Sequence, residues 1–381
     1  MHFADRAMAM PFCRRHLAAL AVLVVTVGGA HAAVLYSVTD LGILPSPFNV
    51  LTSASDINGN GTAIVGTSGG APEAAWLYSS GSLQNLGTLP APYNYQSAGD
   101  GVNNNGQVVG SSTANPLGNL GFHAFLYSDG SMQDLGTLGG LDSVADSIND
   151  FGQIVGKSTI TSGKTHAFIY SDGSMADLST LGGSAGTSEA SAINDNGQIV
   201  GVSSTSAGSN HAFLYGNGTM TDLGTLPSPY NFESGATAIN NNGLIVGFST
   251  TTNAQRQHAF LYSNGILTDL GTLGGANATA MGINDEGVIV GYSDPSGITD
   301  PDAFIYMNGT MTDLNSLIGP GWTLNSANSI NDLGEIVGYG VNPSGANAAF
   351  LLTPLPEPSF AILLVVIGMA MLRRRPITGT S

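Results

Sequence analysis

The sequence predicts an all-β fold, a seven-bladed β-propeller built from four-stranded repeats. Glycine accounts for 53 of the 381 residues, about twice the usual share, and charged residues for only 9%, against ~25% in an average soluble protein. A phrase that contains Ile-Asn or Val-Asn and ends in Ile-Val-Gly or Val-Val-Gly recurs seven times, and no segment has a helical period long enough to compete. Its leading asparagines are spaced 44 to 47 residues apart: Asn58, Asn103, Asn149, Asn194, Asn240, Asn284 and Asn331.

Each repeat predicts four short strands, as the second one illustrates. Its first strand ends at Asn103, where the Asn105-Gly106 turn tolerates positive φ, and Gln-Val-Val-Gly follows as the second strand. A variable loop leads to His-Ala-Phe-Leu-Tyr, the third strand, which begins at His123. The turn Ser128-Asp129-Gly130 then leads to Met-Gln-Asp-Leu-Gly-Thr-Leu, the fourth. Four strands in about 45 residues match one propeller blade.

The two ends of the repeat region predict ring closure. Residues 36–44 read as a fourth strand without the first three, and residues 348–352 read as a third strand without a fourth. If the two pair, the N-terminal strand completes the last blade, and no sheet edge is left open. The alternative is a β-solenoid, but a solenoid usually needs capping units, and none is visible in the sequence.

Residues 1–32 have the pattern of a secretory signal peptide. Arg14 and Arg15 precede a short apolar run at residues 17–27, and Ala30-His31-Ala32 follows as a small-x-small cleavage site. We therefore expect export through the Sec machinery and cleavage after Ala32. A transmembrane anchor is the alternative, although the run is short for the ~20 residues that a span needs. Cys13 is the only cysteine, so the exported part holds no thiol or disulfide.

The charge of the exported part argues against nucleic acid as a partner. The whole chain has a formal net charge of −17. Of its 9 Lys and Arg residues, only Lys157, Lys164 and Arg256 lie between residues 33 and 372. Nucleic-acid binding depends on basic side chains that neutralise phosphates. An acidic body of this kind is also repelled by anionic membrane surfaces.

The C-terminal segment, residues 354–381, has three parts in order. These are Pro356-Glu357-Pro358, an apolar run at residues 360–372, and the basic cluster Arg373, Arg374 and Arg375. The arginines should stay on the cytoplasmic side, which places the repeats outside. The apolar run is short for a permanent span, so we expect transient membrane insertion; an ordinary tail anchor is the alternative.

This tail resembles the PEP-CTERM sorting signal of Gram-negative bacteria. The resemblance implies recognition by exosortase, a membrane protease, after export across the inner membrane, and delivery to the cell surface or the extracellular space. The His-Ala-Phe phrase makes residues 33–353 resemble the HAF family of extracellular repeat proteins, which implies export but no particular activity.

The repeated histidines and acids are predicted to serve architecture. His123, His166, His211 and His258 share one repeat position, which other copies fill with Ala74, Asp302 and Ala348. A catalytic or metal-binding role would not tolerate such exchange. The acids of the Asp-Leu-Gly phrase, such as Asp134, are interpreted in the same way.

One weak cofactor candidate is calcium. Asp56, Asn58 and Asn60 match the start of a calcium loop, but Thr67 stands where a bidentate glutamate is needed. The other copies need their asparagines only for turns. This copy also has one residue more than its siblings, which predicts a β-bulge.

Ligand binding is predicted where the copies differ. Three loops after fourth strands carry two prolines and an aromatic ring, at Phe48, Tyr93 and Tyr230, and Trp322 occupies a comparable loop. Rigid rings with nearby amides suit the faces of sugars. The alternative is that these rings cover the ends of the blades.

Two function classes remain open. The favoured one is a non-enzymatic surface or matrix module associated with extracellular polysaccharide. The other is a propeller-type polysaccharide hydrolase or lyase, which needs unlike acids gathered at one point. The sequence alone brings no two of the non-repeating acids together, and no catalytic residue is assigned. These acids are Glu73, Asp100, Asp142, Glu189, Glu233 and Asp300.

Overall fold

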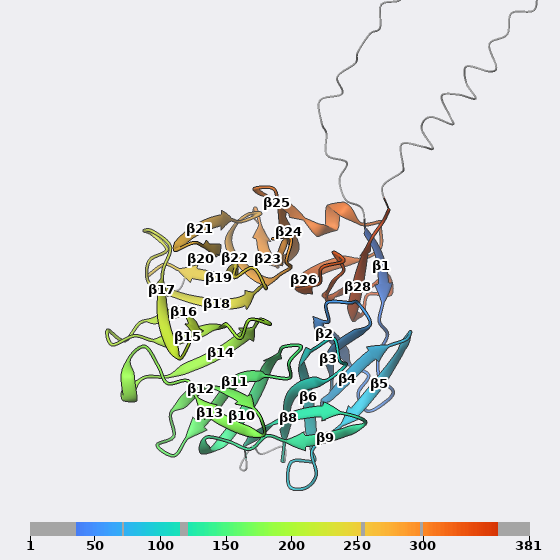
Figure 1. The fold of residues 1–381 in the computed structure, drawn as a ribbon. Helices are drawn as coiled ribbons and strands as arrows, with labels where there is room; N and C mark the ends of the chain where they lie inside the picture. Colours follow the sequence, from blue (N-terminus) through green and yellow to red (C-terminus); the bar gives the residue numbers. More distant parts are fainter. Residues whose placement is uncertain (1–35, 71, 115–120, 253–255, 298–299, 357–381) are drawn as a thin grey trace, which may run out of the picture. The chain divides into compact units, whose positions relative to one another are not determined.

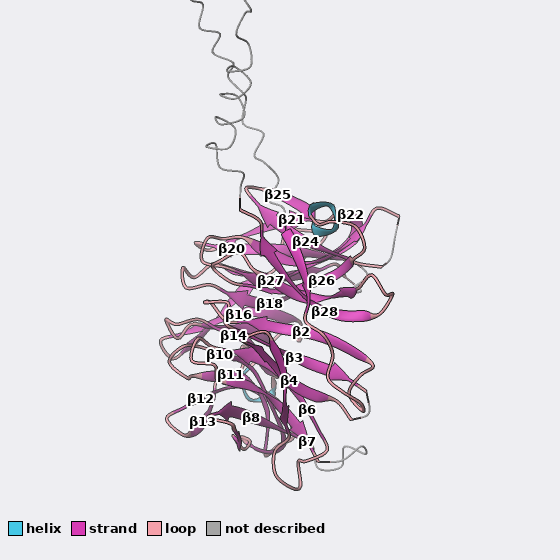
Figure 2. Ribbon diagram, turned by 90° about the vertical axis from the view of Figure 1, so that its right-hand side faces the viewer, coloured by secondary structure: helices cyan, strands magenta, loops and turns pink. Residues whose placement is uncertain are grey.

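The computed structural model describes residues 36–70, 72–114, 121–252, 256–297 and 300–356. Ala32, the apolar tail and its arginines lie outside the described residues, as do Glu357 and Pro358; Pro356 ends the described chain. Figure 2 shows that the regular secondary structure of the described part is nearly all strand, with loops and turns between the strands. Two 3₁₀ turns interrupt them, η1 (Gly183–Ala185) and η2 (Leu314–Leu317). Within these ranges, no helix has the length and apolar character needed to cross a bilayer.

The strands form seven antiparallel four-stranded blades, numbered here in ring order (Figure 1). Blade 1 consists of β2 (Leu51–Ile57), β3 (Ala63–Gly69), β4 (Ala74–Ser79) and β5 (Ser82–Gly87). Blade 2 consists of β6 (Gln96–Val102), β7 (Val108–Thr113), β8 (Phe122–Ser128) and β9 (Ser131–Asp134). Blade 3 consists of β10 (Gly139–Ile148), β11 (Ile154–Ile160), β12 (Thr165–Ser171) and β13 (Ser174–Asp177). Blade 4 consists of β14 (Ser188–Ile193), β15 (Ile199–Ser204), β16 (Asn210–Gly216) and β17 (Thr219–Gly224). Blade 5 consists of β18 (Glu233–Ile239), β19 (Ile245–Thr250), β20 (Gln257–Ser263) and β21 (Ile266–Gly271). Blade 6 consists of β22 (Gly274–Ile283), β23 (Ile289–Pro295), β24 (Asp302–Met307) and β25 (Thr310–Asp313). Blade 7 consists of β26 (Thr323–Ile330), β27 (Ile336–Val341), β28 (Asn347–Pro354) and β1 (Tyr36–Asp40).

The N-terminal strand completes the last blade, as predicted. Strand β1 pairs antiparallel with β28 in a register that runs from Tyr36↔Pro354 to Asp40↔Phe350. The innermost strand of blade 1, β2, also lies against β26 of blade 7, so the ring is closed. The fold is therefore a seven-bladed propeller, and the solenoid alternative is excluded.

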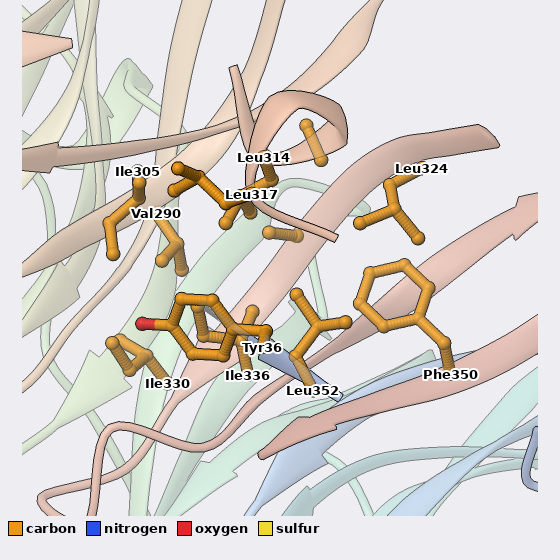
Figure 3. Close-up of a cluster of buried hydrophobic side chains, with 12 residues drawn as sticks. Tyr36, Val290, Ile305, Leu314, Leu317, Leu324, Ile330, Ile336, Phe350 and Leu352 are labelled. Carbon is orange, nitrogen blue, oxygen red and sulfur yellow. The ribbon is translucent and has the colours of Figure 1, made fainter. Parts of the chain in front are cut away.

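The hydrophobic core is divided among seven clusters, each made by two neighbouring blades. Figure 3 shows the cluster between blades 6 and 7, where Tyr36 of β1 packs beside Ile336 and Leu352. The phenylalanine of each His-Ala-Phe phrase is fully buried, and it pairs across the sheet with the glycine of Ile-Val-Gly, as Phe125 does with Gly110. A Cβ at Gly110 would lie 3.0 Å from the Phe125 ring and 2.0 Å from the Ala98 carbonyl. The glycine therefore makes room first for the carbonyl of the neighbouring strand and also for the ring.

The leading asparagines join the blades to one another, a role that the sequence analysis missed. In each turn the side-chain oxygen accepts backbone N–H groups; that of Asn149 accepts from Phe151 and Gln153. The side-chain nitrogen donates to the asparagine carbonyl of the next blade, as Asn149 does to Asn194 over 3.1 Å. The same bond recurs all round the ring, at Asn58→Asn103, Asn103→Asn149, Asn149→Asn194, Asn194→Asn240, Asn240→Asn284, Asn284→Asn331 and Asn331→Asn58.

The outer hairpins have the predicted geometry. In blade 2, Asp129 and Gly130 both have positive φ, 53° and 80°, as a tight two-residue turn requires. The predicted bulge in the first repeat is wrong, however. Its extra residue lengthens the turn between Asn58 and Ala63, while Gly66 keeps the usual pairing with Ala54. The turn absorbs the insertion because it lies at the end of the blade, where no ladder bond is lost.

Candidate functional site

A β-bulge in the innermost strand of every blade lines the central channel. The bulged residue lies three positions before the leading asparagine and is skipped in the strand pairing. Five residue types occupy these positions, which are Ser55, Asp100, Asp146, Ser191, Thr237, Met281 and Asn328. All seven border one cavity of about 520 Å³. The channel wall is therefore asymmetric although the scaffold is not.

One mouth of the channel is ringed by residues that directly follow the asparagines. The Asp150 carboxylate accepts the backbone N–H of Asn104 at 2.8 Å, and the Asp195 carboxylate accepts that of Asp150 at 3.0 Å. The same pattern continues through Asn241, Asp285 and Asp332. These acids bind neighbouring blades together, so their repetition has a structural cause.

A charged cluster lies deeper in the channel, on blades 2 to 4. Asp100 and Asp146 occupy adjacent bulges, and Lys157 of β11 donates to Glu189 of β14 at 3.0 Å. Burial raises the pKa of Asp100 to about 7, although the charge of Lys157 opposes this. Burial and then the Asp100 charge raise the pKa of Asp146 well above its usual value. Burial alone would lower the pKa of Lys157, but the Glu189 hydrogen bond and the nearby acids raise it.

A second cavity, of about 340 Å³, meets the channel at Lys157 and Glu189, which line both. We call it the Phe122 cavity. Its wall also includes Phe122, Asp142 and the hydroxyls of Ser111, Ser143, Ser158, Thr159 and Thr165. The Phe122 side chain is 43% exposed. Hydrogen bonds hold the backbone at this point. The Phe122 N–H donates to Asp142 Oδ1 at 3.1 Å, and the Asp142 N–H donates to the Thr159 hydroxyl at 2.9 Å.

The four predicted aromatic residues pack against the blades. Tyr93 stacks on His123 with 3.8 Å between ring centroids, and Tyr230 stacks on His258 at 3.9 Å. The Tyr230 hydroxyl also lies 2.7 Å from Nε2 of His258. Phe48 packs against the core between blades 7 and 1, and Trp322 meets Phe350 edge-on at 6.4 Å. All four are half-buried, as expected of rings that cover the ends of the blades.

The histidine and the acid of each full repeat meet within their own blade. Nδ1 of His123 lies 2.8 Å from Asp134, and His166, His211 and His258 form the same pair with Asp177, Asp222 and Asp269. Each pair links the third strand of its blade to the fourth. The interpretation as architecture agrees with this arrangement, because the pairs lie in separate blades.

The oxygens of the calcium candidate are engaged by protein donors. Asp56 accepts from the Val102 N–H and the Ser329 hydroxyl, and Asn58 accepts from the backbone of Thr62 and Ala63. Asn60 accepts from the Thr62 N–H. Across the described ranges, no group of three His, Cys, Asp or Glu side chains converges as metal ligands would.

The structure places three of the six non-repeating acids, Asp100, Asp142 and Glu189, in the walls of the two cavities. The others, Glu73, Glu233 and Asp300, line neither. Sequence reasoning missed Asp146 and Lys157. A signal was available, because the residue three before each leading asparagine varies among Ser, Asp, Thr, Met and Asn, whereas the residue just before it is Ala in six copies and Gly in one.

Comparisons with known proteins give a fold but no function. Residues 173–347 match a family described as a protein of unknown function, DUF3466, and no curated protein matches the chain. An oligogalacturonate lyase from Vibrio parahaemolyticus is similar in structure, with 9% identity, TM-score 0.51, and 84% of this chain and 94% of that chain covered. This likeness shows the β-propeller fold.

Two further structures are less similar. TolB from Acinetobacter baumannii has 10% identity and a TM-score of 0.42, over 81% of this chain. The match spans 65% of that TolB chain, less than two thirds of its length. A gluconolactonase from Xanthomonas campestris has 12% identity and a TM-score of 0.38, with 85% and 92% covered.

Proposed function

We propose that this chain is an exported, non-enzymatic binding module that holds an extracellular polysaccharide in the Phe122 cavity. The observation that carries the proposal is that residues breaking the repeat pattern gather at this one cavity. Phe122, Asp142, Lys157 and Glu189 come from blades 2, 3 and 4. Phe122, Lys157 and Glu189 have no counterparts of the same type in the other blades, whereas Glu233 of blade 5 is an acidic counterpart of Asp142.

The chemistry of the cavity suits a sugar. A pyranose ring offers an apolar face and a rim of hydroxyl groups. The exposed Phe122 ring can stack on the apolar face. The carboxylate of Asp142 and the hydroxyls of Thr159 and Thr165 can form hydrogen bonds with the sugar hydroxyls. A volume of about 340 Å³ falls within the ~300–1,000 Å³ of small-molecule sites.

The ends of the chain supply the cellular part of the proposal. The signal-like residues 1–32 support export through the Sec machinery. The order Pro-Glu-Pro, apolar run and arginine cluster supports transient membrane insertion and processing by an exosortase-type protease. A surface or matrix location would place the Phe122 cavity among exopolysaccharides.

Retention of the full-length protein on immobilised exopolysaccharide of the source bacterium tests the binding role. We expect Phe122→Ala to lower retention at least tenfold. Phe151→Ala is the matched control, because Phe151 is 75% exposed in a turn outside the cavity. The Tyr93→Ala/Tyr230→Ala double variant should retain wild-type binding. Equal loss in Phe122→Ala and Phe151→Ala, or loss only in the tyrosine variant, would contradict the site.

A second candidate is a polysaccharide hydrolase or lyase. One observation favours it: Asp100 and Asp146 line the same channel, and a carboxyl group with a pKa of about 7 is suited to donate a proton near neutral pH. Release of new reducing ends from the polysaccharide by the wild-type protein, abolished in Asp100→Asn, would decide for the enzyme.

A further inference from the structure

Two carboxylates in the central channel stand out because the protein leaves them without a hydrogen-bond donor. Among the described residues, no donor lies within hydrogen-bond distance of the Asp100 or Asp146 side chain, whereas three other side chains of the channel are hydrogen-bonded to the protein. Asp56 accepts two bonds, Thr237 donates to the Ala280 carbonyl at 2.7 Å, and Asn328 donates to the Ala54 carbonyl at 2.7 Å. Both free carboxylates border the 520 Å³ cavity.

The channel carries a strong excess of negative charge. Asp56, Asp100, Asp146 and Glu189 line its interior, whereas Lys157 is the one basic side chain in the described lining and is paired with Glu189. The mouth adds the carboxylates of Asp150, Asp195, Asp285 and Asp332. A narrow passage lined by one sign of charge concentrates ions of the opposite sign. The channel therefore favours cations.

The shape of the lining favours an organic cation over a metal ion. No three acidic or histidine side chains of the described chain converge on one point, and the cavity is far larger than an ion. Ser55, Ser191 and Met281 are also part of the wall. These groups can accept hydrogen bonds from, and pack against, a small molecule of a few carbon atoms.

We propose that the central channel is a second binding site, which takes a small organic cation whose primary ammonium group lies between the carboxylates of Asp100 and Asp146. An ammonium group offers three donors, and the two adjacent bulges present oxygens that the protein itself does not use. This site is separate from the Phe122 cavity, although Lys157 and Glu189 border both.

The affinity should depend on pH in a defined direction. Ammonium binding needs ionised carboxylates, and burial raises the pKa of Asp100 to about 7. At pH 6 most of this group is protonated, and at pH 8 most is ionised, so the ionisation of Asp100 by itself should raise affinity about tenfold between the two. Asp56, Asp146, Lys157 and Glu189 face the same space. The charge of Lys157 opposes the rise in the pKa of Asp146, whereas those of Asp100 and Glu189 add to it.

Isothermal titration of the full-length protein in detergent with putrescine tests the site. At pH 8 we expect one bound putrescine per chain, with affinity at least tenfold weaker in Asp100→Asn and in Asp146→Asn. Glu286→Gln is the matched control, because it removes one negative charge from an exposed turn outside the cavity. Phe122→Ala should leave putrescine binding unchanged, which separates this site from polysaccharide binding.

Three results would overturn the inference. The first is the absence of a binding heat for putrescine at pH 8. The second is equal affinity in the wild type, Asp100→Asn and Asp146→Asn. The third is calcium binding that depends on Asp100 while putrescine does not bind, which would assign the site to a metal ion. Circular dichroism of each variant checks that the nearly isosteric Asp→Asn changes leave the fold intact.

Discussion

The Asn331 side chain donates to the Asn58 carbonyl over 3.4 Å, which joins the last blade to the first across 273 residues of sequence. It is the closing member of a ring of seven such bonds, all on buried asparagines. Because the same side chains also hold the turns of their own blades, each asparagine stabilises one hairpin and one blade-to-blade contact. This double role explains why the Ile-Asn or Val-Asn phrase occurs in all seven copies.

Replacing one member of this ring should cost more than replacing a neighbouring polar residue. Asn149→Ala removes the oxygen that accepts two N–H groups of the turn and the nitrogen that donates to Asn194. Because the site is buried, we expect the change to lower the free energy of unfolding by about 3 kcal/mol. Urea unfolding followed by circular dichroism measures this. Asn105→Ala is the control, since Asn105 is exposed and makes a single bond to the Asp150 carbonyl. Equal effects of the two changes would refute the role of the ring.

The closing strand gives a second stability prediction. Tyr36 is 5% exposed and packs between blades 6 and 7. Tyr36→Ala should therefore lower the free energy of unfolding by about 3 kcal/mol, as large-to-small changes in a core do. Tyr339→Ala provides the comparison, because Tyr339 belongs to the same blade but is 38% exposed. A thermal unfolding temperature that falls no further in Tyr36→Ala than in Tyr339→Ala would show that β1 adds little to closure.

Blade number, strand order and closure could be predicted because they depend on periodicity. The repeat region begins with a single fourth strand and ends with a third strand that lacks a fourth. Pairing the two completes the last blade, and β1 pairs with β28 in this way. The channel could not be predicted in the same way. A bulge turns the side chains of Asp100 and Asp146 toward the axis, and nothing in a two-residue alternation indicates that turn. The place of Lys157 depends on contact between blades, which periodicity does not specify.

The channel carboxylates predict an unusual pH dependence of stability. Their folded pKa values lie above the value of about 4 expected in the unfolded chain. The folded state then binds these protons more tightly than the unfolded chain does. The resulting gain in the free energy of unfolding is fully present below about pH 4 and is lost as pH rises through about 7. Thermal unfolding of the wild type and Asp100→Asn/Asp146→Asn should therefore diverge between pH 5 and pH 8, with the variant more stable at pH 8. A constant difference across this range, as expected for Glu286→Gln, would contradict the prediction.

The proposed sorting role of the C-terminal segment predicts a dependence of surface delivery on the Pro-Glu-Pro phrase. If Pro356-Glu357-Pro358 is read by a membrane protease, replacing all three by alanine should abolish cleavage while the apolar run still inserts. Full-length protein should then accumulate in the inner-membrane fraction of the source bacterium, and the shorter surface form should disappear from immunoblots. Replacing Thr378, Gly379 and Thr380 by alanine, beyond the arginine cluster, is the matched control and should leave delivery intact. Because an ordinary tail anchor would not depend on the Pro-Glu-Pro phrase, unchanged surface delivery of the first variant would identify the segment as an anchor instead.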